Sequence, residues 1–368
     1  MNKMIYLCAA AALTLASCSN DETVEVAQQK GISFRAVTGL NTRASEVTTA
    51  NLSALKVTAF WNKNNNKYDG FDTEVDYVKD GGAFNSADSK FWPKDENEVL
   101  SFTAFSDNWT GTKNITDKNN ISVDGVKIAG TVADQKDMVY VTGVTGTKAA
   151  NETNGVQLTL KHALSQIQIS AKSDNTVYTY QVKGIRISYV DGEANFDVVG
   201  GTWSENGANN EIYTVKYATP VTLNGTAQSI MEQKQDNGTN YSDNAMLLPQ
   251  GATTAWNVEN DKANTNKGTY ISVLLRITKG ADNVFPAEGT ETYGWAAVPV
   301  SFTWNKGNKY VYTLDFTNGA GRVDPVDPGT DVDPGNKDPD KGDKILGDPI
   351  KFTVTVTPWN PTDNGINM

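Results

Sequence analysis

The sequence has almost none of the residues that metal sites and many enzyme active sites require. His162 is the one histidine among 368 residues, and the two cysteines, Cys8 and Cys18, both lie close to the N-terminus. One histidine excludes multi-histidine metal sites and most histidine-based triads. No cysteine remains in the rest of the chain for a disulfide, a redox motif or an iron–sulfur cluster. We therefore expect no enzyme, no cofactor and no metal site, and we interpret His162 as a hydrogen-bonded core residue.

Positive charge is also scarce. Lysine and arginine total 32 against 43 aspartates and glutamates, which gives a formal net charge of -11 and an isoelectric point near 4.7. Binding to phosphate backbones needs a basic face, so nucleic acid is excluded as the main partner. Hydrophobic residues still make up 38% of the chain, so we expect folded domains rather than a disordered polypeptide.

Long apolar runs are absent except at the N-terminus. The run from Met4 to Ala16 is too short to span a bilayer and is typical of a signal-peptide core. It ends in Leu15-Ala16-Ser17-Cys18, which resembles a bacterial lipobox, where the cysteine receives acyl chains such as palmitate and the peptide is cut before it. We predict a lipoprotein signal peptide at 1–17, lipidation of Cys18 and a polar tether at 18–30. An ordinary secretory signal with an incidental cysteine is the alternative.

The body of the chain alternates between apolar and polar residues with period two, and helical periodicity is scarce. Many short strands separated by Gly, Asn and Asp turns indicate β-sandwiches or barrels. The pattern is too long for one sandwich, so we predict an N-terminal domain at 31–173 and a C-terminal domain at 174–320. We also expect the strands that flank Asn305-Lys306-Gly307-Asn308 to form a hairpin. The clearest alternating segments are 55–61, 100–104, 185–189 and 271–277.

Residues 321–347 break this pattern because Asp-Pro recurs four times within them. Proline removes backbone donors and fixes φ, so we predict a semi-stiff, acidic linker without a sheet ladder. An Asp-rich calcium loop is the alternative, although the spacing does not match an EF-hand.

One isolated strand is expected in the C-terminal segment, 348–368. A single strand does not fold alone, so it must join a sheet of its own chain or of a neighbour. Residues 32–36 near the N-terminus show a matching alternation, and detachable strands at opposite ends favour exchange between copies by β-augmentation. The apolar residues of the expected donor strand are Ile350, Phe352, Val354 and Val356.

Eight tryptophans offer a second kind of interaction surface. Trp61 and Trp304 fit strand positions that face a core. Trp109 and Trp256 lie in expected loops, where an exposed indole is able to stack on a sugar ring.

Several motifs, in this order, resemble the Bacteroidales fimbrillin family, the subunits of lipoprotein-derived type V pili. The resemblance covers nearly the whole chain that follows the signal peptide. The acidic residues after Cys18 also resemble the surface-export signal of Bacteroidetes lipoproteins, with a solvated tether as the alternative. The motifs that carry the family resemblance are 15–18, Gly31-Ile32-Ser33-Phe34, Thr42-Arg43-Ala44, 158–167, Gly200-Gly201-Thr202-Trp203, 246–250 and 304–314.

This resemblance implies two tandem transthyretin-like Greek-key β-sandwich domains in an all-β chain. It also implies export to the outer membrane with a lipid anchor, then cleavage after an arginine by a surface protease, which removes the first strand and opens a groove. The bond between Arg43 and Ala44 matches that site by its position in polar sequence, with an ordinary surface arginine as the alternative. The implied partners are other fimbrial subunits in head-to-tail strand exchange.

We therefore predict a structural subunit or accessory adhesin of a cell-surface fimbria, with a host or bacterial surface receptor or glycan as a further partner. The alternative is a lipid-anchored surface glycan-binding protein of a polysaccharide-uptake system. The long Asp-Pro segment is unusual for a compact shaft subunit and also admits an anchor or accessory subunit.

Overall fold

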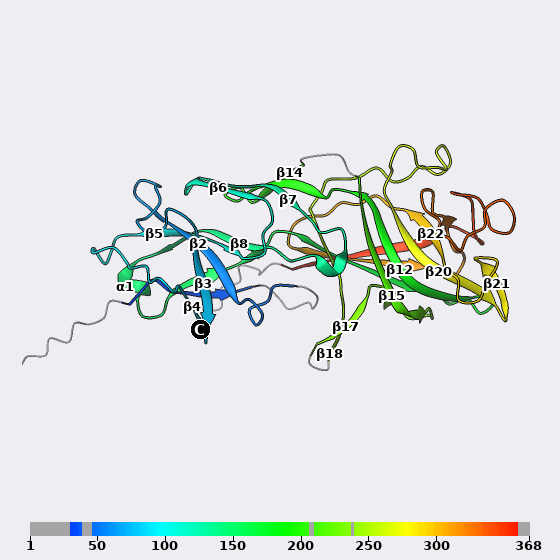
Figure 1. Ribbon diagram of the computed structural model, residues 1–368, viewed down its shortest axis with the longest axis horizontal. Helices are drawn as coiled ribbons and strands as arrows, with labels where there is room; N and C mark the ends of the chain where they lie inside the picture. Colours follow the sequence, from blue (N-terminus) through cyan, green and yellow to red (C-terminus); the bar gives the residue numbers. More distant parts are fainter. Residues whose placement is uncertain (1–29, 39–45, 206–209, 237–238, 360–368) are drawn as a thin grey trace, which may run out of the picture.

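The computed structural model describes residues 30–38, 46–205, 210–236 and 239–359. These residues form packed β-sheets arranged along one long axis (Figure 1). The predicted all-β sandwich class is confirmed. Cys8, Cys18, Arg43 and Ala44 lie outside the described residues.

The N-terminal sheet has the strand order β10-β8-β5-β2-β3-β4-β1-β9 and curves around its own hydrophobic core. Alternate residues of the strands point inward, and they include Leu55, Val57 and Phe102. A short helix, α1 (Lys148–Asn151), precedes β9. The strands are β1 (Phe34–Val37), β2 (Ala54–Trp61), β3 (Val75–Asp80), β4 (Ala83–Asn85), β5 (Leu100–Ser106), β8 (Val139–Gly146), β9 (Val156–Thr159) and β10 (Lys161–His162).

A bridging sheet combines strands from the two halves of the sequence, in the order β14-β13-β7-β6. It shares a second core with the N-terminal sheet, and this core includes Phe60, Phe105 and Phe196. Because cores cover both faces of β5, every residue of that strand is buried. The bridging strands are β6 (Thr112–Asp117), β7 (Asn120–Lys127), β13 (Glu193–Asp197) and β14 (Thr202–Glu205).

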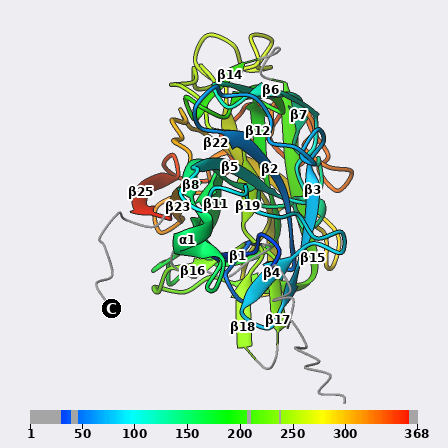
Figure 2. The same cartoon turned by 90° about the vertical axis from the view of Figure 1, so that its left-hand side faces the viewer.

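The C-terminal half is a sandwich of two sheets around a third core. We call them the tail sheet, which ends with β25, and the linker sheet, which ends with β24. In Figure 2, β23 and β25 of the tail sheet lie beside each other at one side of the molecule. The tail sheet contains β11 (Ser165–Lys172), β16 (Gln228–Ser229), β19 (Ala245–Leu247), β23 (Asn308–Asp315) and β25 (Lys351–Pro358). The linker sheet contains β12 (Thr179–Val190), β15 (Glu211–Thr222), β20 (Tyr270–Lys279), β21 (Asp282–Phe285), β22 (Gly294–Pro299) and β24 (Arg322–Val323). The hairpin β17 (Gln233–Asp236) and β18 (Thr239–Ser242) and the 3-10 turn η1 (Val132–Asp134) complete the described elements.

The position at which the core changes and the pairing of one strand both differ from the expectation. The change of core falls between Leu160 and Ile167, because β11 already belongs to the tail sheet, so it precedes the expected boundary at residue 173. The expected hairpin around residues 305–308 is wrong, because β22 and β23 belong to opposite sheets. Alternation identifies an apolar face, but it does not identify the strand that pairs with it.

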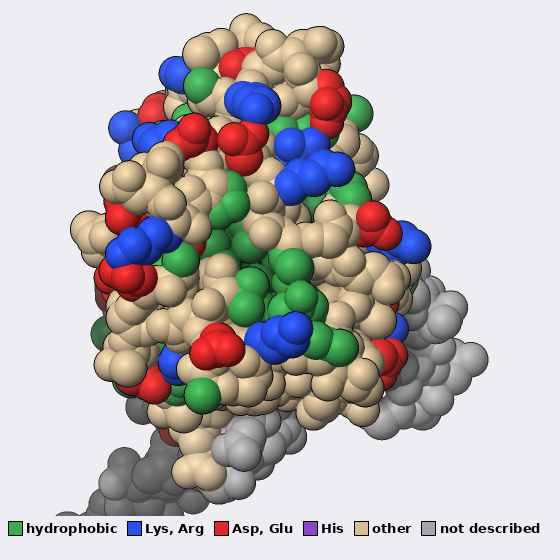
Figure 3. Space-filling model, turned by 90° about the vertical axis from the view of Figure 1, so that its right-hand side faces the viewer, with side chains coloured by type: hydrophobic (Ala, Val, Ile, Leu, Met, Phe, Trp, Pro, Cys, Tyr) green, Lys and Arg blue, Asp and Glu red, His purple; other side chains and the backbone are tan. Residues whose placement is uncertain are grey.

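Residues 321–347 lie against the C-terminal sandwich instead of extending as a free spacer. β24 pairs with β22, and the buried Asp324 carboxylate accepts hydrogen bonds from the Ser272 hydroxyl at 2.5 Å and the Tyr270 hydroxyl at 3.3 Å. Burial and this carboxylate raise the pKa of Tyr270, so its hydroxyl remains a donor. Figure 3 shows this end of the molecule, where charged side chains of both signs surround an area of apolar ones.

Replacing Asp324 with alanine is expected to lower the free energy of unfolding by about 3 kcal/mol, because it strips the buried Ser272 and Tyr270 hydroxyls of an acceptor. Thermal unfolding measures this loss, and limited proteolysis reports whether 325–345 detaches. Asp340→Ala is the control at an exposed position of the same segment, and its change is expected to stay within about 0.5 kcal/mol. Equal effects of the two variants would contradict the anchoring role of Asp324.

Candidate strand-exchange site

β1 is an internal strand of the N-terminal sheet. It pairs in parallel with β9 from Phe34 opposite Val156 to Val37 opposite Thr159, and it meets β4 at Phe84. Backbone hydrogen bonds fix both of its ends: the Ile32 N–H donates to the Lys90 carbonyl at 2.6 Å, and the Leu160 N–H donates to the Val37 carbonyl at 2.9 Å. β1 is therefore built into the sheet.

The apolar side chains of this segment fill the N-terminal core. Ile32, Phe34 and Ala36 are all buried, and Phe34 is 0% exposed. The Phe34 ring meets the rings of Tyr77 and Phe102 edge to face, with centroids 4.8 and 5.1 Å apart. Edge-to-face pairs stabilise a core beyond simple area burial, so β1 contributes strongly to the stability of this half.

β25 occupies the opposite kind of position, at the edge of the tail sheet. It pairs antiparallel with β23 over its whole length, from Lys351 opposite Asp315 to Pro358 opposite Asn308. In this chain, the expected donor strand therefore completes a sheet of its own polypeptide. Figure 1 shows β1 in blue and β25 in red in different halves of the molecule.

The side chains of β25 remain exposed although its backbone is paired. Phe352, Val354 and Val356 are 38%, 42% and 49% exposed. Directly paired residues project to the same face of a sheet, and the β23 partners of these three residues are buried core residues. The apolar row of β25 thus lies on the core side of the sheet, at an edge that the linker sheet leaves uncovered.

The two residues that flank β25 are buried, unlike the strand itself. Ile350 and Trp359 are 4% and 1% exposed. The Trp359 ring stacks on His162, with the centroids 3.9 Å apart and the planes inclined by 11°. His162 is fully buried, and its Nδ1 lies 2.7 Å from Asp137 Oδ2, so the predicted hydrogen-bonded core histidine is confirmed. Sequence analysis could not identify the role of Trp359, because its partners lie far away along the chain.

The tryptophans are not arranged as sugar-stacking platforms. Trp109 and Trp256 are 9% and 2% exposed, so the expectation that they are exposed is wrong. Trp109 packs in the core shared with the bridging sheet, and the Trp256 indole N–H donates to the Asp261 carbonyl at 2.7 Å. Trp304 is a core residue as predicted, and Trp61 is half-buried against Tyr68. All eight tryptophans lie in described residues, and none of them is exposed.

Layered sheets, a buried N-terminal strand and an uncovered C-terminal edge strand define the class of this chain as an all-β sandwich protein. The profile of the fimbrillin-like family matches residues 42–359, and the chain belongs to this family. Membership gives the protein a fimbrial or adhesin type of structural role at the cell surface, in contact with other fimbrial subunits.

Solved structures of bacterial adhesion and fimbrial proteins are similar to the chain at low sequence identity. A candidate cell adhesion protein of Bacteroides uniformis is 16% identical, covers 90% of this chain and 99% of its own, and has a TM-score of 0.46. One from Bacteroides ovatus is 14% identical, with coverage of 91% and 99% and a TM-score of 0.47. The fimbrial anchor protein Mfa2 of Porphyromonas gingivalis is 12% identical, with coverage of 77% and 90% and a TM-score of 0.32. No curated protein sequence matches the chain.

Within the described ranges, the structure contains no helix with the length and apolarity needed to cross a bilayer.

Proposed function

We propose that this protein is a structural subunit or accessory adhesin of a fimbria, exported as a lipoprotein through Cys18 and activated by cleavage between Arg43 and Ala44. Assembly then proceeds by strand exchange between copies. The observation that carries this proposal is the position of β1, a fully built-in strand that ends shortly before the expected cleavage site.

Cleavage after Arg43 separates all of β1 from the rest of the chain. Departure of β1 leaves β4 and β9 without their shared neighbour and uncovers Tyr77 and Phe102. Unpaired strand edges and exposed aromatic rings are both costly in water. The processed subunit is therefore expected to bind a replacement strand.

β25 of another copy is suited to replace β1, because it is an extended edge strand with a row of exposed apolar side chains. Its apolar row already lies uncovered, and insertion would bury it. Each net backbone hydrogen bond contributes about 0.5–1.5 kcal/mol, and each buried apolar side chain contributes roughly 1.5–3 kcal/mol. Because β1 and β25 belong to different halves of the chain, the contact is heterologous, and repeated contacts of this kind build a filament.

Treating the purified chain with trypsin tests this proposal. We expect a new N-terminus at Ala44, followed by ladders that resist SDS and that disappear when residues 348–368 are deleted. The control Arg43→Ala should keep β1 and remain monomeric under the same treatment. Monomers from the cleaved wild-type chain would contradict strand exchange.

The glycan-binding alternative rested on the lipobox, the acidic tether and the tryptophans of the sandwiches. Burial of Trp109 and Trp256 argues against the tryptophan part of that basis.

A further inference from the structure

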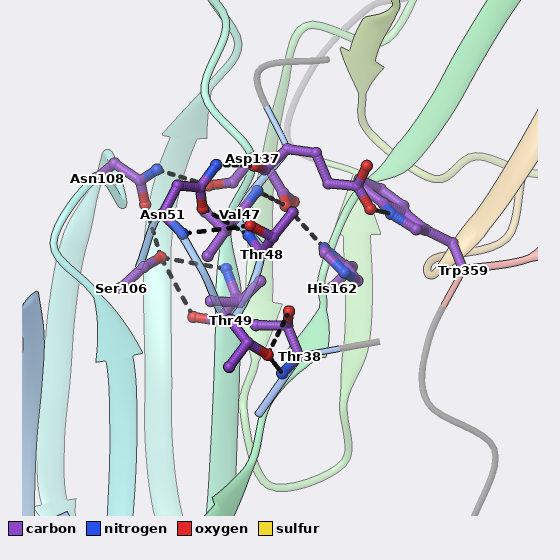
Figure 4. A network of polar contacts seen from close by, with 12 residues as sticks. Thr38, Val47, Thr48, Thr49, Asn51, Ser106, Asn108, Asp137, His162 and Trp359 are labelled. Carbon is purple, nitrogen blue, oxygen red and sulfur yellow. Dashed lines mark hydrogen bonds and ion pairs between the residues drawn. The ribbon is translucent and has the colours of Figure 1, made fainter. Parts of the chain in front are cut away.

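Trp359 joins the end of β25 to the segment that follows the expected cleavage site. Its indole N–H donates to the Glu46 carboxylate, and its backbone N–H donates to the Gly307 carbonyl at 2.7 Å. Glu46 is 1% exposed and is separated from Trp359 by 313 positions in the sequence. We call Trp359, Glu46 and His162 the clasp, and Figure 4 labels Trp359 and His162.

Hydrogen bonds fix the segment 46–51 next to the clasp. The Val47 N–H donates to Asp137 Oδ2 at 2.8 Å, and the same carboxylate oxygen contacts His162. The Asn51 side-chain amide donates to the Glu46 carbonyl at 2.7 Å. Figure 4 shows these groups as one network, in which His162 is linked to Val47 through the Asp137 carboxylate. A shift of 46–51 would move Glu46 away from the Trp359 indole and break the link to His162.

This network also reaches β1. The Thr38 N–H, directly after the last residue of β1, donates to Thr49 Oγ1 at 3.0 Å. A continuous series of contacts therefore runs from β1 through 46–51 to Trp359, and from Trp359 to β25. The first member of the series is the strand that cleavage removes, and the last is the strand that a neighbour would receive.

We infer that the clasp holds β25 in its own sheet while β1 is in place, and that loss of β1 on processing loosens it. This inference builds on the proposed strand exchange. The side chains of β25 are exposed along its length, so its attachment depends on the ladder to β23 and on its two buried ends. A strand with few buried side chains opens locally when one end is freed. The clasp thus keeps unprocessed subunits from exchanging strands prematurely.

Hydrogen exchange of the backbone amides of residues 351–357 tests the clasp in the intact chain, since Pro358 has no amide hydrogen. We expect Trp359→Leu to speed their exchange by about tenfold or more, because local opening sets the rate. Glu46→Ala provides an independent variant with the same expected direction, and it changes no residue of the tail sheet. Trp256→Leu is the matched control, since Trp256 packs in a separate small cluster, and it should leave these amides unchanged. Wild-type rates in both clasp variants would overturn the inference.

The coupling to β1 is tested by comparing the same amides before and after cleavage. Cleaved wild-type chain, analysed before ladders form, should exchange faster by about tenfold, and Thr49→Val should raise the rate in the intact chain by a smaller factor. Unchanged β25 exchange after cleavage would overturn the coupling. If exchange accelerates but no ladder ever forms, strand exchange fails while the clasp stands. If ladders form without acceleration, the clasp fails while strand exchange stands.

Discussion

Replacing Phe34 with alanine is expected to lower the free energy of unfolding of the uncleaved chain by about 3–5 kcal/mol, as for other fully buried phenylalanines. The ring is 0% exposed and packs edge to face on Tyr77 and Phe102, so its loss leaves a cavity in the N-terminal core. Denaturant unfolding followed by tryptophan fluorescence measures the change.

Arg35→Ala is the matched control. Arg35 is next to Phe34 in β1, but its side chain is exposed, so removing it should change the free energy of unfolding by no more than about 0.5 kcal/mol. After cleavage between Arg43 and Ala44, the Phe34→Ala chain and the wild-type chain should become equally stable, because β1 has left both. A difference that persists in the cleaved proteins would mean that β1 stays bound and the sheet never opens.

Replacing Val354 with lysine is expected to abolish the SDS-resistant ladders of the cleaved protein while the monomer remains folded. In the monomer Val354 is 42% exposed, so a lysine there should change the free energy of unfolding by less than about 1 kcal/mol. In a neighbour's sheet the same position would be buried, where an unpaired ammonium group is strongly disfavoured. Ladder formation and thermal unfolding are measured on the same samples.

Thr355→Lys is the control for this prediction. Thr355 neighbours Val354 in β25 and projects to the opposite face of the strand, so its lysine variant should still form ladders. Loss of ladders in both variants would show that any charge on β25 blocks assembly, and ladders in both would show that the Val354 face is not buried in the polymer.

The sequence predicted the apolar faces of the strands well. Leu100, Phe102 and Ala104 line one core as their alternation indicated. The same pattern could not show that Ser101 and Thr103 are also buried, because their burial comes from the bridging sheet. That sheet includes β13 and β14, which begin about 90 residues or more after Thr103, and alternation contains no information about such distant partners.

The site was predictable only in part. The two terminal strands and the buried state of His162 followed from local alternation, and the structure contains both strands. Lipidation of Cys18 and cleavage after Arg43 stay predictions. Trp109 and Trp256 were expected to be exposed because polar residues surround them in sequence, yet tertiary packing covers both. In the acidic segment 321–347, Asp324 accepts a hydrogen bond from Ser272 of the linker sheet. Composition could not predict this contact.

Phe34 and Phe352 show what each level of structure decided. Both occupy the same place in an Ile-x-Phe pattern, and the sequence alone determined that each would point to the apolar face of a strand, because successive side chains of an extended backbone alternate. Only the tertiary structure decided that Phe34 is enclosed and that Phe352 is 38% exposed. The reason is that burial depends on whether a second layer covers the strand: the curved N-terminal sheet encloses β1, and the linker sheet ends before it reaches β25.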